Sequence, residues 1–157
     1  RFKTQPVFYG ATEFRSDGDW NQTYGLHEWR QTDAGLPANL LKSLSLPYGT
    51  VVSEIEMWID GGSGSQHSVV PATMPAVWIQ RYALSEGASG IGSASVIDSV
   101  SDDETVVAEY EKLHAVSKSV SITIEPDYLY QIGVSGETGA GAVNQALRFY
   151  GVKLSFN

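Results

Sequence analysis

Residues 17–28, DGDWNQTYGLHE, have the spacing of a calcium-binding loop. Such loops supply oxygen ligands from their first, third, fifth, seventh and twelfth positions, among others. Carboxylate or amide side chains stand at four of these positions: Asp17, Asp19, Asn21 and Glu28. The sixth position, which needs glycine for a sharp turn, is Gln22. We therefore expect no metal here, and we interpret the stretch as a polar loop whose Asp and Asn residues shape a turn.

The other polar residues do not form a catalytic motif. The three histidines, His27, His67 and His114, lack the HExxH spacing of a zinc hydrolase, and no GxSxG nucleophile motif occurs. The absence of cysteine excludes thiolate chemistry. Glu54 and Glu56 have the chemistry of a glycosidase pair, but carboxylates at i and i+2 on an outward strand face are more typical of solubilising residues. We expect neither enzymatic activity nor a cofactor.

The aromatic residues carry the clearest signal of binding. Tryptophans that stand in predicted loops or on predicted outward strand faces are Trp20, Trp29, Trp58 and Trp78. Exposed aromatic rings mark a protein interface or a platform on which a sugar ring stacks. We favour subunit contact over glycan binding, because the sequence holds no further signature of sugar recognition. Both interpretations remain open at this point.

The composition limits the partners. The 157 residues include ten basic and eighteen acidic side chains, for a formal charge of -8. This charge repels phosphate backbones and anionic lipids, so we expect no nucleic acid and no membrane as partners. No apolar run reaches the roughly 18–20 residues of a membrane helix.

Two-residue alternation of apolar and polar side chains indicates the fold. It is regular in four stretches, 50–60, 118–125, 127–136 and 146–157, and weaker in six more: 6–14, 25–31, 40–46, 76–84, 91–100 and 104–116. One face of the first stretch is expected to hold Val51, Ile55, Met57 and Ile59. A short helical turn is possible within 36–46. About ten short strands separated by Gly- and Pro-rich turns predict a single all-β domain, a sandwich or a barrel.

The order of features resembles the jelly-roll-like β-sandwich domains of tailed-phage virion proteins. The resemblance rests on QPVFYGATEF near the start, LPYGTVVSEIEMWID in the middle and the terminal YGVKLSF. It implies an all-β, antiparallel two-sheet β-sandwich of jelly-roll type, with no catalytic residues. Related virion proteins commonly form trimers around symmetry axes, so the resemblance also implies self-association, most simply as a homotrimer.

We interpret the protein first as a capsid decoration (cement) protein on the virion surface, bound to neighbouring copies and to the major capsid protein. Residues 1–15 are the expected extended docking arm and 16–157 the sandwich. The arm has a local basic excess and exposed aromatic rings, and its candidate docking residues are Arg1, Phe2, Lys3, Phe8 and Tyr9. The alternative is a carbohydrate- or receptor-binding domain of a phage fibre or tail protein. A glycoside hydrolase is a weaker third hypothesis.

Overall fold

The protein is a sandwich of two antiparallel β-sheets. The computed structural model describes residues 5–22, 28–34, 38–62 and 66–157. Its elements are β1 (Val7–Gly10), η1 (Ala11–Glu13), β2 (Arg15–Ser16), β3 (Trp20–Gln22), β4 (Trp29–Gln31), β5 (Asn39–Leu44), β6 (Val51–Asp60), β7 (Ala76–Ala83), β8 (Ser95–Ser101), α1 (Val107–Tyr110), β9 (His114–Thr123), β10 (Tyr128–Ser135) and β11 (Arg148–Phe156).

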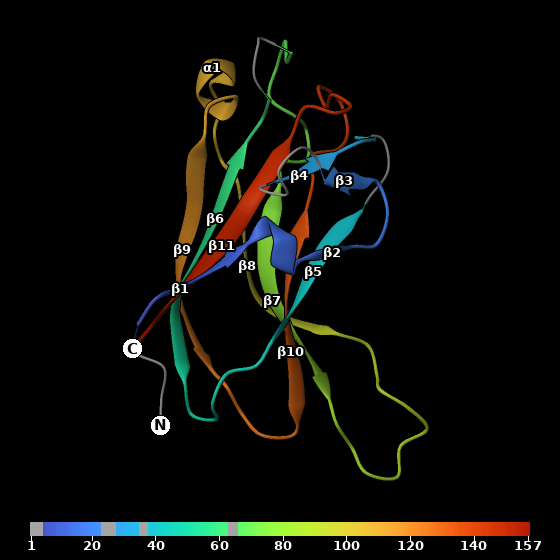
Figure 1. The fold of residues 1–157 in the computed structure, drawn as a ribbon, viewed down its shortest axis with the longest axis vertical. Coiled ribbons are helices and arrows are strands. Elements are labelled where there is room, and N and C mark those ends of the chain that lie inside the picture. Colours follow the sequence, from blue (N-terminus) through green and yellow to red (C-terminus); the bar gives the residue numbers. More distant parts are fainter. Residues whose placement is uncertain (1–4, 23–27, 35–37, 63–65) are drawn as a thin grey trace.

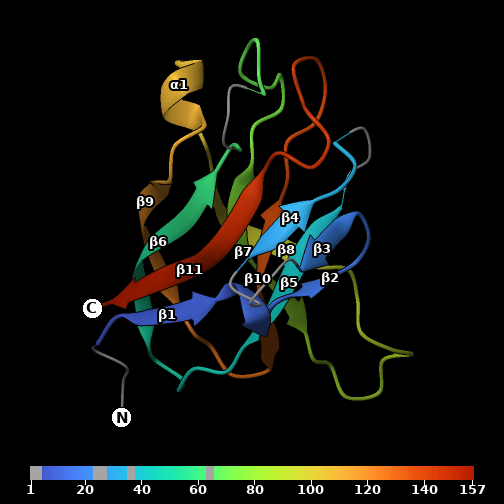
Figure 2. The same cartoon turned by 45° about the horizontal axis from the view of Figure 1, so that its top comes forward.

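The two sheets have different strand orders. Sheet A runs β3-β4-β11-β6-β9, with β1 also paired to β11, and sheet B runs β2-β5-β10-β7-β8. Figure 2 shows the strands of sheet A in front of β7 and β10 of sheet B. The loops that follow β6 and β10 gather with α1 at one end of the sandwich, whereas the β9–β10 turn and the long β7–β8 loop lie at the other (Figure 1). This arrangement confirms the predicted antiparallel two-sheet β-sandwich.

The core lies between the sheets and is built from alternate residues of their central strands. Ile55, Met57 and Ile59 of β6 are fully buried, as are Val77 and Ile79 of β7. Side chains of β10 and β11 complete the same cluster, including Ile132, Val152 and Leu154. Burial of apolar area stabilises the fold by about 25 cal/mol per Å², so this alternation is what fixes which face of each strand turns inward.

One alternation differs from the prediction at the start of β6. The sequence predicted that Val51 shares the core face with Ile55, but Val52 is the fully buried residue and Val51 is only half-buried. The pairing of β6 with β9 shifts register between Val52 and Glu54. Such a bulge adds one residue to the strand, which reverses the alternation on one side of it.

Two other predictions of secondary structure were wrong. Within 104–116, which was predicted as a strand, residues Val107–Tyr110 form the helical turn α1. The ring of Tyr110 is buried against Gly61, whose backbone N–H donates to the Tyr110 carbonyl (N···O 2.9 Å). The helical turn suggested within 36–46 is absent from the described part of that range, where residues 39–44 form β5. In both segments tertiary packing overrides local pattern.

The predicted docking arm is only partly described. Arg1, Phe2 and Lys3 lie outside the described residues. Phe8 and Tyr9 belong to β1, which pairs with β11 in the register Phe8↔Lys153 and Tyr9↔Val152. Residues 7–10 are therefore joined to sheet A, whereas Arg15 belongs to β2 of sheet B, and a docking role for the arm stays a prediction. Within the described residues no helix has the length and apolarity to cross a bilayer.

Candidate ligand-binding face

The outward face of sheet B carries three rows of side chains set by strand register. The first row crosses all five strands and contains Arg15, Leu41, Gly133, Trp78 and Ser99. The second contains Ser43, Gln131, Gln80 and Val96, and the third contains Leu129 and Tyr82. Each row faces outward because its neighbours along β7 and β10, such as Ile79 and Ile132, are fully buried in the core.

Trp78 lies across the backbone of β10 at Gly133. A Cβ atom placed on Gly133 would lie 2.1 Å from Cε2 and 2.3 Å from Cζ2 of the indole. The ring therefore occupies the space that any other side chain would need at position 133. This contact holds the indole low on the sheet, where it forms a platform between β7 and β5.

A directed chain of hydrogen bonds fixes the platform. The indole Nε1–H of Trp78 donates to Gln80 Oε1 (2.9 Å), and Gln80 Nε2 donates to Gln131 Oε1 (2.9 Å). An indole only donates, so the orientation of both amides follows from it. Among the described residues no group accepts a hydrogen bond from Gln131 Nε2. That amide group is therefore left to donate to a ligand.

Three adjoining hollows lie along β5 and β10, and Gln131 lines the first two of them. The first, about 490 Å³, is lined by Glu13, Arg15, Leu41, Lys42, Ser43 and Gln131. The second, about 350 Å³, shares Ser43 and Gln131 with the first and adds Tyr82, Ile91 and Leu129. The third, about 500 Å³, shares Leu44, Leu129 and Tyr130 with the second and lies around the end of sheet B, because the side chains of Leu44 and Tyr130 belong to the core face. We call the three together the sheet-B groove.

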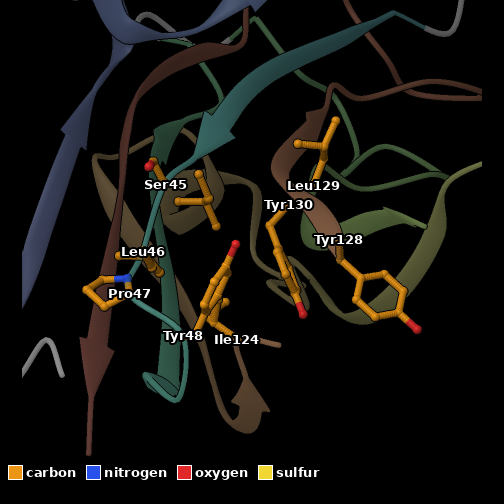
Figure 3. A pocket seen from close by; sticks show the side chains of 9 residues that line it. Ser45, Leu46, Pro47, Tyr48, Ile124, Tyr128, Leu129 and Tyr130 are labelled. Atoms are coloured by element: carbon orange, nitrogen blue, oxygen red, sulfur yellow. The ribbon is translucent and has the colours of Figure 1, made fainter. Parts of the chain in front are cut away.

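The third hollow ends the groove among tyrosines at the tip of the sandwich. Tyr48 is 66% exposed and projects from the β5–β6 loop. Figure 3 shows the rings of Tyr48 and Tyr130 at the hollow, with their hydroxyl groups pointing in opposite directions and Tyr128 pointing away from both. The Arg81 guanidinium stacks 3.9 Å from the centre of the Tyr128 ring. This stacking holds Tyr128 in place beside the hollow.

The other predicted tryptophans lie elsewhere. Trp58 is on the outward face of sheet A, where its Nε1 donates to Glu56 Oε1 (2.7 Å) and Lys153 also contacts Glu56 (3.2 Å). Trp20 is buried, and its Nε1 donates to the Ala38 carbonyl (3.2 Å). Trp29 donates to the Ala11 carbonyl (2.8 Å) at the junction with η1. The four indoles therefore do not form one platform, and Trp78 alone belongs to the sheet-B face.

The predicted oxygen ligands of 17–28 do not converge. Asp17 Oδ1 accepts from the Asn39 backbone N–H (2.6 Å), and Glu28 Oε2 lies 3.6 Å from Arg148 Nε. Asn21 pairs with Arg30 across β3 and β4, and the Asp19 carbonyl accepts from the Thr32 backbone N–H. In the part of the chain that the structure describes, no group of His, Asp and Glu side chains has the arrangement of a metal site. The described part of the stretch, 17–22 and 28, instead contains β3 and the turn before it, and residues 23–27 lie outside the described residues.

A buried ionic cluster at the opposite end of the sandwich had no sequence signal. His67 Nε2 lies 2.7 Å from Glu137 Oε2, and His67 Nδ1 lies 3.1 Å from Glu111 Oε2. The side chains of His67 and Glu137 are fully buried. Burial raises the pKa of Glu137 to about 7, although the hydrogen bond from His67 opposes the shift. The cluster ties together three segments that lie 44 and 70 residues apart in sequence.

This cluster is suited to bracing loops rather than to catalysis. Gln31 exchanges two hydrogen bonds with the Glu137 backbone, at 2.9 Å each, and the Tyr110 ring packs edge-on against His67 with ring centres 5.3 Å apart. A substrate does not reach side chains that are fully buried among such partners. The absence of enzymatic activity stays a prediction.

Comparison with solved structures places the fold among carbohydrate-binding modules. The chain is similar to the C-terminal CBM6 of LamC, a marine laminarinase from Zobellia galactanivorans (TM-score 0.55, 10% identity, 96% of this chain and 99% of that one). It is also similar to the xylan-binding module CBM15 (0.52, 12%, 98% and 97%) and to CsCBM6-3 from Clostridium stercorarium in complex with cellobiose (0.50, 9%, 98% and 93%). No family model and no curated protein matches the sequence.

These likenesses show the fold alone, because the identities are 12% or lower. They confirm the jelly-roll β-sandwich that the resemblance implied. They do not support a tailed-phage origin or a capsid decoration role.

Proposed function

We propose that this protein is a carbohydrate-binding module that holds a glycan chain along the sheet-B groove. The observation that carries the proposal is the hydrogen-bonded row Trp78–Gln80–Gln131. A pyranose ring has an apolar face of C–H groups and a rim of hydroxyl groups. The indole matches the apolar face, and the unpaired amide of Gln131 matches the rim.

The side chains proposed to contact the sugar are already held in position before binding. Each stacking or hydroxyl contact contributes little by itself, so affinity depends on groups that need not be immobilised on binding. Gly133 and Gln80 hold Trp78, and Gln80 in turn holds Gln131. The structural neighbours are binding modules for polysaccharides or their fragments, which agrees with this proposal. A homotrimer on a virion surface stays a prediction that nothing further supports.

The experiment is gel retardation of the full chain in gels that contain xylan, laminarin, hydroxyethylcellulose, galactan or dextran. We expect retardation by at least one polysaccharide and a loss of about tenfold or more in affinity for Trp78→Ala. Trp58→Ala is the matched control, because that indole is also half-buried and also donates to a side chain two residues away on its strand, but on sheet A. No retardation by any polysaccharide, or equal loss in both variants, contradicts the proposal.

A further inference from the structure

The end of the sheet-B groove next to β2 contains two cations that lack acidic partners. Arg15 and Lys42 line the first hollow. Five of the eight Lys and Arg residues in the described ranges lie within 4.0 Å of a carboxylate oxygen: Arg81, Lys112, Lys118, Arg148 and Lys153. Arg15 and Lys42 do not, and the residues outside the described ranges include no Asp or Glu.

The two cations differ in how they are held. Lys42 is in register with the buried Ile132, so its side chain leaves β5 on the core side. Its Nζ donates to the Ser43 carbonyl (3.0 Å) and lies 5.7 Å from the centre of the Tyr9 ring of sheet A. The exposed Arg15 guanidinium makes no hydrogen bond to the described residues. Glu13 shares the hollow, but its Oε2 already accepts from the Gly10 backbone N–H (3.0 Å). The hollow therefore has a net positive charge on a chain of formal charge -8.

Arg15 is placed where a glycan on the platform would reach it. Arg15 and Trp78 stand in the same row of the sheet-B face, with Leu41 and Gly133 between them. Three strand spacings separate β2 from β7, which is about 14 Å. A short oligosaccharide stacked on Trp78 and running toward β2 extends over this distance.

We infer that the glycan carries a uronate residue whose carboxylate is bound by Arg15. This inference rests on the proposed function and names its ligand class. A guanidinium presents paired N–H donors that match the two oxygens of a carboxylate. Isolated uronate groups on a mostly neutral chain fit better than a polyanion. The protein has a formal charge of -8, which repels the many closely spaced charges of a polyanion. Salt screens this repulsion for a single carboxylate that is bound by Arg15.

The test is calorimetric titration of the full chain with glucuronoxylan and with the same polymer after chemical reduction of its carboxyl groups. We expect the acidic polymer to bind about tenfold more tightly than the reduced one, as one charge-assisted contact provides. In Arg15→Gln the ratio of the two affinities should fall close to one. In Arg15→Lys it should lie between one and the wild-type ratio of about ten. Lys118→Gln is the control: it removes the same charge from a cation that pairs with Asp98, and it keeps the wild-type ratio.

The outcomes separate this inference from the proposed function. Equal binding of the acidic and reduced polymers overturns the uronate assignment but leaves glycan binding intact. Tighter binding of a sulfated galactan than of glucuronoxylan also overturns it, as does tighter binding of polygalacturonate, because each points to general anion attraction. If neither xylan nor any other glycan binds, both proposals fail together.

Discussion

Trp78 and Gly133 are paired across β7 and β10, and the indole of one covers the backbone of the other. The absence of a side chain at Gly133 is what lets the ring lie flat on sheet B. Gly133 itself is buried beneath the ring, in an otherwise regular strand. The aromatic platform beside the sheet-B groove therefore depends on this glycine as much as on the tryptophan.

Gly133→Ala is expected to raise the indole from the sheet. Because the added Cβ would clash with the ring at 2.1 Å, we expect a loss of about 1–3 kcal/mol in the free energy of unfolding, as for other overpacked sites. Glycan affinity should fall as well. Chemical denaturation followed by tryptophan fluorescence measures the first effect. Gly10→Ala is the control, since a Cβ there meets nothing within 4 Å, and equal destabilisation of the two variants would refute the role of Gly133.

Gln131→Ala is expected to weaken glycan binding without unfolding the protein. The substitution removes the free Nε2 donor, and a typical net hydrogen bond contributes about 0.5–1.5 kcal/mol, so we expect a loss of up to about tenfold in affinity. Isothermal titration calorimetry gives the value. Gln22→Ala, an exposed glutamine on β3, serves for comparison. Unchanged affinity in Gln131→Ala would remove the amide from the binding site.

The tyrosines at the tip of the sandwich are expected to matter only for long ligands. Tyr48 lines the third hollow, beyond Leu129, so a short oligosaccharide bound at Trp78 does not reach it. We expect Tyr48→Ala to lower affinity for long oligosaccharides and to leave the shortest binding ligand unaffected. Affinity measured against chain length tests this. Leu113→Ala, a similarly exposed apolar residue at the opposite end, should have no effect at any length.

The stability of the fold is expected to fall as pH rises through neutrality. Burial raises the pKa of Glu137 from 4.5 to about 7, so the folded state holds a proton that the unfolded chain releases. His114 acts in the same direction: burial alone lowers its pKa, but hydrogen bonds to Asp102 and to the Lys112 carbonyl outweigh burial and raise it. Both contributions are complete at low pH, below the unfolded values of 4.5 and 6.5, and are lost as pH rises through the folded values.

Thermal unfolding between pH 5 and pH 8 measures this effect. For Glu137 the loss is on the order of 3 kcal/mol. Glu137→Gln, which is neutral at every pH, should flatten most of the slope. Asp98→Asn is the contrasting variant: a hydrogen bond from Lys118 lowers the pKa of Asp98, so its contribution is lost on the acid side instead. A Glu137→Gln protein with the wild-type slope would show that the slope has another origin.

The sequence predicted the strands better than it predicted the site. Alternation in 50–60 identified Ile55, Met57 and Ile59 as core residues, because each is set by the period of its own strand. The bulge that buries Val52 depends on pairing with β9, so local pattern does not reveal it. The same limit applies to α1, which is held by contacts of Tyr110 with a glycine 49 residues earlier.

One residue of the candidate site, Trp78, was already a candidate from the sequence, and its binding role stays a prediction. Trp78 was named as a platform residue, and the alternation of β7 places Gln80 and Tyr82 on the same face. Gln131 and Gly133 had no signal, because their roles come from the register between β7 and β10. The four tryptophans that the sequence grouped together do not share one face in the structure. Trp20, Trp29 and Trp58 stand on strands of sheet A, whereas Trp78 stands on sheet B. His67 and Glu137 meet because the loops that hold them lie at the same end of the sandwich, far apart in sequence.

Nuclear magnetic resonance of the indole N–H groups tests the central claim most directly. Each tryptophan gives one such signal, and the signals are assigned by single Trp→Phe variants. We expect an oligosaccharide fragment of the polysaccharide that retards the protein in the gel to shift the Trp78 signal. The indole ring would stack on this ligand beside its hydrogen bond to Gln80. The Trp58 signal, on the opposite sheet, should not move. A shift of Trp58 without a shift of Trp78 would contradict glycan binding on the sheet-B face.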